Sequence, residues 1–82
     1  MDHDEILSSI NELMRDIFNE EDLVATDEMT ADDVDDWDSH NHVRLMVAIQ
    51  ERFNIEFNGK EVNAPENVGE LVEIVASKLK SR

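Results

Sequence analysis

The chain has 82 residues, a mass of 9.4 kDa, a formal net charge of −14 and no cysteine. We expect one domain, residues 1–82, with a small core, because a chain this short buries only about 60% of its unfolded surface. The absence of cysteine excludes disulfides, thiolate nucleophiles and cysteine-ligated metal sites. The strong negative charge argues against nucleic-acid binding and favours basic partners.

The negative charge is concentrated in the first half of the chain. Residues 1–38 contain 15 acidic residues and one base, Arg15, whereas residues 39–82 contain six of each. Apolar residues make up 40% of the chain and recur at helical spacing, which favours a folded domain over disorder. The longest apolar run is Leu45–Ile49, too short to span a membrane, and the acidic N-terminus has no signal-peptide pattern. We therefore expect a soluble, cytoplasmic monomer.

The first periodic segment predicts a helix from about Asp4 to Phe18. Residues 19–38 follow as a long connection in which ten of 20 positions are Asp or Glu, and loops of this length are often functional. Apolar residues recur through this connection, and we expect them to fasten it to the core. They are Leu23, Val24, Met29, Val34 and Trp37.

A second helix is predicted from Ser39 to about Phe53, with Asp38 as its N-cap. Its expected core stripe is Val43, Met46, Val47 and Phe53, widened by Leu45 and Ile49. The Ile55–Phe57 piece is too short to build a sheet, and residues 60–63 are expected to form one helical turn.

The last helix is predicted to start at Asn67, with Glu70 placed to close a capping box. The sequence therefore predicts an all-α fold. It is a small antiparallel bundle of three main helices plus a short fourth helix, with a long loop between the first two helices.

The sequence offers no catalytic set. Ser39 and His40 are adjacent, so on a helix they point about 100° apart and do not form a nucleophile–base pair. We expect the three histidines, His3, His40 and His42, to face solvent or lie at the core boundary. The acidic loop lacks the alternating ligands, the central glycine and the terminal glutamate of a calcium-binding loop. We therefore predict neither an enzyme nor a specific metal site.

Ser39 is the remaining candidate. A serine at the start of a helix lies in a positive local potential beside unpaired N–H groups, which suits a bound phosphate. From the Asp38-Ser39 dipeptide alone, an ordinary helix cap is the better interpretation.

The wider context changes this interpretation. The stretch DDVDDWDSHNHVRLMVAIQERFNIEF, residues 32–57, resembles the acyl carrier protein family. Asp38 and Ser39 match the first two positions of that family's Asp-Ser-Leu motif. NVGELVEIVASKL, residues 67–79, looks like the family's last helix. Further positions follow at the family's spacing: Val43, Leu45, Met46, Ala48, Ile49, Glu51, Phe53, Ile55 and Phe57.

The resemblance implies that Ser39 carries a covalent 4′-phosphopantetheine, attached by a phosphopantetheinyl transferase, with Asp38 as motif residue and helix cap. The arm would hold acyl groups as thioesters and present them to acyl-loading, acyl-transferring and condensing enzymes of a fatty-acid, polyketide or related pathway. The partner-binding residues that it implies are His40, Arg44, Met46 and Val47.

Two departures from the family pattern indicate a specialised carrier. His40 stands where the family usually has Leu or Met, and Arg44 and Arg52 add positive charge to a helix that is usually acidic in housekeeping fatty-acid carriers. Three alternatives stay open at this point. They are a peptidyl or aminoacyl carrier, an acidic helical interaction module without a prosthetic group, and a divalent-ion buffer.

The charge distribution gives the first testable prediction. Because the net charge of −14 arises before Ser39, self-repulsion should lower the stability of the fold at low salt. Added NaCl or millimolar Mg²⁺ should raise the midpoint of thermal unfolding, measured by circular dichroism. A midpoint that responds to neither would show that self-repulsion is not a significant contribution.

Overall fold

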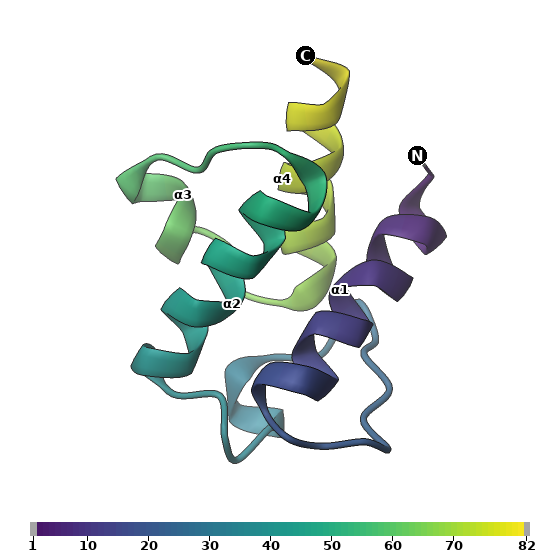
Figure 1. The fold of residues 1–82 in the computed structure, drawn as a ribbon, viewed down its shortest axis with the longest axis vertical. Helices are drawn as coiled ribbons and strands as arrows, with labels where there is room; N and C mark the ends of the chain where they lie inside the picture. The colour runs from purple at the N-terminus through teal and green to yellow at the C-terminus, as the bar shows by residue number, and fades with distance from the viewer. Residues whose placement is uncertain (1, 82) are drawn as a thin grey trace.

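The computed structural model describes residues 2–81, which form four α-helices and one 3₁₀ turn and contain no strand (Figure 1). The prediction of an all-α fold is confirmed. The 3₁₀ turn, η1, lies within the predicted long loop and was not expected from the sequence. The elements are α1 (His3–Ile17), η1 (Ala31–Asp33), α2 (Ser39–Phe53), α3 (Gly59–Asn63) and α4 (Val68–Lys80).

The long helices α2 and α4 both contact α1. Figure 1 shows that α1 runs opposite to α2 and α4, whereas α2 and α4 point in the same general direction. The reason is the segment of residues 54–67, which contains α3 and returns the chain along the bundle before α4 begins. The antiparallel relation therefore holds between α1 and each of its two neighbours.

The helix starts follow the capping chemistry in the sequence. Asp38 and Asn67 cap α2 and α4 as predicted, each accepting a hydrogen bond from a first-turn backbone N–H at 2.8 Å. The capping box predicted for α4 does not close, because the Glu70 carboxylate accepts from the N–H of Glu66 instead. A complete capping box is present at α3, between Asn58 and Glu61.

One face of each long helix supplies the core. The fully or nearly buried helical side chains are Ile6, Ile10 and Met14 of α1, Leu45, Met46, Ile49 and Phe53 of α2, and Val68, Leu71, Val72 and Val75 of α4. The predicted core stripe of α2 was wrong for Val43 and Val47, which are 54% and 45% exposed. The apolar residues of α2 cover more than one stripe, so spacing alone left the rotation of this helix undetermined.

Residues 19–38, hereafter the acidic loop, are fastened to the core largely as predicted. Leu23 and Val34 are buried, and Met29 and Trp37 are partly buried against the core. Val24 was predicted to join them but is 65% exposed, and the neighbouring Ala25 is buried in its place.

Two polar side chains of α1 hold the first part of the acidic loop. The Asn11 amide donates to the carbonyl of Leu23 at 3.3 Å and accepts a hydrogen bond from the backbone N–H of Ala25. Arg15 donates from Nε to the same Leu23 carbonyl at 2.6 Å. The loop backbone therefore has partners where it forms no regular secondary structure, as buried peptide groups require.

The next part of the loop lies against the start of α4. The N–H groups of Val68 and Gly69 donate to the carbonyls of Met29 and Asp27, both at 2.9 Å. These N–H groups belong to the first turn of α4 and have no partner within their own helix. A side chain at Gly69 would place its Cβ 3.1 Å from both Cβ and the carbonyl oxygen of Asp27, a tight contact that glycine avoids.

Asp27 also pairs with the first residue of α1, and this pair gives a pH-dependent prediction. His3 Nε2 lies 2.7 Å from the Asp27 carboxylate, and this hydrogen bond is the main cause that raises the pKa of His3 above 6.5. A raised folded-state pKa means that the pair stabilises the fold below the unfolded pKa and loses this effect as the pH rises through the folded one. Asp27→Asn should therefore return the pKa of His3 toward 6.5, as measured by NMR titration.

The same variant tests whether protonation of His3 stabilises the fold. The stability difference between wild type and Asp27→Asn should be larger below the unfolded-state pKa of His3 than at alkaline pH, above its raised folded-state pKa. An unchanged His3 pKa in Asp27→Asn would contradict the assignment of this pair.

Candidate functional site

Ser39 is the first residue of α2 and its side chain is exposed. Within residues 2–81 its hydroxyl has no hydrogen-bond partner, and it does not contact the neighbouring His40 as a nucleophile would contact a base. The backbone N–H groups of Ser39 and His40 belong to the open first turn of the helix. An accessible hydroxyl therefore lies beside two unpaired N–H donors.

The residues around Ser39 fix the start of the helix. The Asp38 carboxylate accepts from the N–H of Asn41 at 2.8 Å, and the Asp38 carbonyl accepts from the N–H of His42 at 2.8 Å. The Asn41 side chain donates to the carbonyl of Asp36 at 2.8 Å. The last residues of the acidic loop and the first turn of α2 thus form one hydrogen-bonded unit. The side chain of Ser39 stays exposed at the surface of this unit.

Trp37, two residues before Ser39, is held by three contacts. Its indole Nε1 donates to Nδ1 of His42 at 3.0 Å, and its ring stacks on the imidazole with centroids 6.1 Å apart. On the α1 side it packs against Phe18, with ring centroids 5.5 Å apart. The second imidazole nitrogen of His42, Nε2, lies 2.6 Å from the carbonyl of Val62 in α3.

These bonds define the tautomer of His42. A backbone carbonyl only accepts, so Nε2 carries the hydrogen and donates to Val62. Nδ1 is then free of hydrogen and accepts from Trp37. The half-buried His42 connects the loop before Ser39, the first turn of α2 and the short α3. The sequence predicted a boundary histidine here but not this connection, because Val62 lies 20 residues further along the chain.

The structure places the predicted partner residues on two sides of α2. His40 and Arg44 are exposed, and Val47 is 45% exposed, so all three are accessible to a docked protein. Met46 is only 2% exposed and belongs to the core, so its prediction as a partner-binding residue was wrong. The exposed apolar residue that the prediction missed is Val43, one turn before Val47. Val43 and Val47 stand one turn apart on the exposed side of α2, whereas Met46 is buried in the core.

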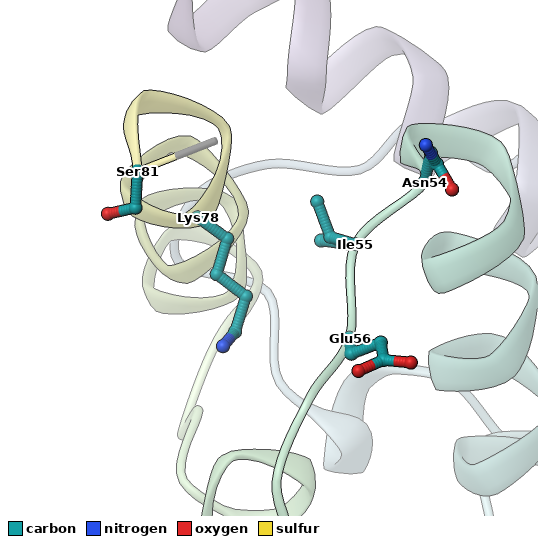
Figure 2. Close-up of a pocket in the computed structure, with 5 residues that line it drawn as sticks. All are labelled: Asn54, Ile55, Glu56, Lys78 and Ser81. Atoms are coloured by element: carbon teal, nitrogen blue, oxygen red, sulfur yellow. The ribbon is translucent and has the colours of Figure 1, made fainter.

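Ser39 lines neither of two hollows near the ends of α2. An open depression of about 440 Å³ lies at the far end of α2, between residues 54–56 and the end of α4 (Figure 2). Its cation, Lys78, is already paired with Glu61 at 2.7 Å, and this hydrogen bond lowers the pKa of the Glu61 carboxyl. A smaller cavity of about 60 Å³ near Trp37 and His42 is also lined by Ala31, Pro65, Glu66, Asn67 and Leu71.

Residues 2–81 contain no group of three His, Asp or Glu side chains arranged to hold a metal ion. Among the helices described, none is long and apolar enough to cross a membrane.

The site is compatible with a phosphodiester on Ser39. The hydroxyl is exposed and unpaired, the first-turn N–H groups and the helix dipole favour a negative charge, and the Asp38 carboxylate is engaged by Asn41. The long arm of such a group would extend into solvent from the junction of the acidic loop and α2.

Comparison with known proteins identifies a similar fold. The structure is similar to the solution NMR structure of the holo acyl carrier protein from Geobacter metallireducens, with a TM-score of 0.86 and 33% sequence identity. The match covers 93% of this chain and 87% of that protein. No family model matches the sequence, and no curated protein matches it.

The contacts of Trp37 give a further prediction. Trp37→Phe keeps an aromatic ring against Phe18 but removes the N–H that binds His42, so the free energy of unfolding should fall by about 1–3 kcal/mol. The measurement is urea denaturation. In the wild type, nitrogen NMR should show the Nε2–H tautomer at His42, because Nδ1 accepts from Trp37 and Nε2 donates to Val62. His40 provides the solvent-exposed comparison, and identical tautomer mixtures at the two histidines would contradict the Trp37–His42 bond.

Proposed function

This chain belongs to the acyl carrier protein family, and we propose that it carries acyl groups on a 4′-phosphopantetheine arm attached to Ser39. The observation that supports this most directly is the exposed, unpaired hydroxyl at the first position of α2. The relative from Geobacter metallireducens is described as a holo protein, which fits the same modification here.

Each residue at the site has a separate task in this proposal. Ser39 supplies the hydroxyl that a phosphopantetheinyl transferase modifies with coenzyme A as donor. Asp38 caps α2 and so fixes the position of that hydroxyl. The N–H groups of Ser39 and His40 stabilise the negative charge of the phosphodiester. The arm itself would supply the thiol on which acyl groups are carried as thioesters.

The protein acts as a carrier and not as a catalyst in this proposal. Reactions of the acyl group belong to the partner enzymes, which load, transfer or condense it, while the carrier provides attachment and recognition. The proposed pathway is a specialised one, because Arg44 and Arg52 distinguish α2 from the acidic helix of housekeeping carriers. A peptidyl or aminoacyl carrier is the alternative within the same chemistry. The cytoplasmic location stays a prediction from the sequence.

Modification of Ser39 is directly testable. Co-expression with a broad-specificity phosphopantetheinyl transferase should add one phosphopantetheine mass to the wild type, read by intact-protein mass spectrometry. Ser39→Ala should abolish the addition while the far-UV helical signal is retained, because Ser39 makes no side-chain contact that the fold needs.

Two further variants complete this test. Ser8→Ala, at another exposed serine on a helix, should be modified as the wild type is. Asp38→Asn keeps a side-chain acceptor for the N–H of Asn41, so it should leave the thermal stability nearly unchanged. Addition of the same mass to Ser39→Ala would overturn the assignment of Ser39.

A further inference from the structure

Two of the exposed large apolar side chains within residues 2–81 lie together on α2. Val43 and Val47 are 54% and 45% exposed and stand one helical turn apart. They line a shallow depression of about 350 Å³ between the end of α1 and the middle of α2. We call this surface the α2 face, and its lining residues are Ile17, Val43, Arg44, Val47, Ala48 and Glu51.

The α2 face lies close to the attachment point. Val43 and Val47 are four and eight residues after Ser39, which places them about 6 and about 12 Å further along the helix axis. Any enzyme that receives a group carried on Ser39 must approach this end of α2. Because this step assumes that Ser39 carries the arm, the inference rests on the proposed function.

The charge on the α2 face differs from that of the rest of the molecule. Arg44 has no carboxylate within ion-pairing distance among residues 2–81, and its guanidinium donates only to the Asn41 side chain, at 3.2 Å. Two other cations are already neutralised, Arg52 by Glu12 at 2.9 Å and Lys78 by Glu61 at 2.7 Å. In a chain with a net charge of −14, α2 therefore presents an unneutralised cation next to exposed valines.

The surroundings of Arg44 limit where a matching negative charge fits. Asp36 and Asp38 are exposed on the loop side of Ser39, and Glu51 closes the far edge of the depression. A partner that is acidic over a wide area would be repelled by these carboxylates and by the acidic loop. A partner surface with one carboxylate opposite Arg44 and basic groups opposite Asp36 and Asp38 would be complementary in charge to this side of the molecule.

We propose that the α2 face docks a partner enzyme through an apolar side chain seated over Val43 and Val47 and a carboxylate that pairs with Arg44. The carboxylate opposite Arg44 replaces the basic residue that an acidic carrier helix would require. A uniformly basic docking patch is therefore selected against, because it places like charges in contact at Arg44. The apolar contact supplies binding area, and the ion pair fixes which partner is accepted.

The test uses one enzyme in two forms. The probe is a bacterial malonyl-CoA:acyl carrier protein transacylase with a basic docking patch, together with a variant in which the basic residue facing α2 is changed to Glu. The wild-type carrier should be loaded with a kcat/KM about tenfold higher by the Glu variant than by the original enzyme. Arg44→Glu should reverse this preference.

Matched controls separate a local ion pair from net charge. Arg52→Glu changes the net charge by the same amount as Arg44→Glu, but at a residue paired with Glu12 outside the depression, so it should leave the preference unchanged. Val47→Ser should lower kcat/KM with both enzyme forms while preserving the helical signal, because Val47 lies outside the core. A preference that Arg44→Glu does not alter, or that Arg52→Glu alters equally, would overturn the proposal.

The same assays distinguish this inference from the proposed function. Every variant is first converted to its phosphopantetheinylated form and checked by intact mass. Failure of that step would count against Ser39 as the attachment point, whereas normal modification with no effect at Arg44 would count only against the docking arrangement.

Discussion

The hydrogen bonds that Asn11 and Arg15 form with the acidic loop fix the start of the segment that leads to Ser39. The loop contains ten carboxylates in 20 residues, so mutual repulsion favours its expansion. Its backbone is instead fixed to α1 at Leu23 and then to the first turn of α4 at Asp27 and Met29. Arg15, the one Lys or Arg residue of residues 1–38, also brings its positive charge to this loop. The chain therefore reaches Trp37 with its path already determined.

The polar side chains around Ser39 form hydrogen bonds with backbone groups. Asp38 holds the N–H of Asn41, Asn41 holds the carbonyl of Asp36, and His42 holds the carbonyl of Val62. Ser39 takes no part in these bonds, although it stands in the middle of them. A fixed frame and an uncommitted hydroxyl are together what a reactive attachment point needs, because a hydroxyl bound by its neighbours would have to break those bonds to react.

Much of the fold followed from local sequence signals. The helix bounds were predicted within one residue at the starts of α2 and α4, where Asp38 and Asn67 cap. Ser39 was predicted to start a helix and is the first residue of α2, while its role as the attachment point stays a proposal. Predictions failed where the answer depended on distant partners. The apolar spacing of α2 allows more than one buried face, and only the packed structure distinguishes the buried Met46 from the exposed Val43. The Trp37–His42–Val62 connection joins three segments, and no local pattern encodes such a set.

The hydrogen bond from His42 to α3 has a consequence for how the sequence of α3 can vary. Its acceptor is the main-chain carbonyl of Val62, which every amino acid possesses. Substitution at Val62 changes packing but does not remove the acceptor, and the exposed positions Gly59, Lys60 and Asn63 take no part in the bond. The exposed side chains of α3 can therefore vary while the helix keeps its hydrogen bond to α2, whereas Glu61 is engaged by Asn58 and Lys78. The exposed positions of α3 thus form a second surface whose sequence can change without loss of the His42–Val62 hydrogen bond.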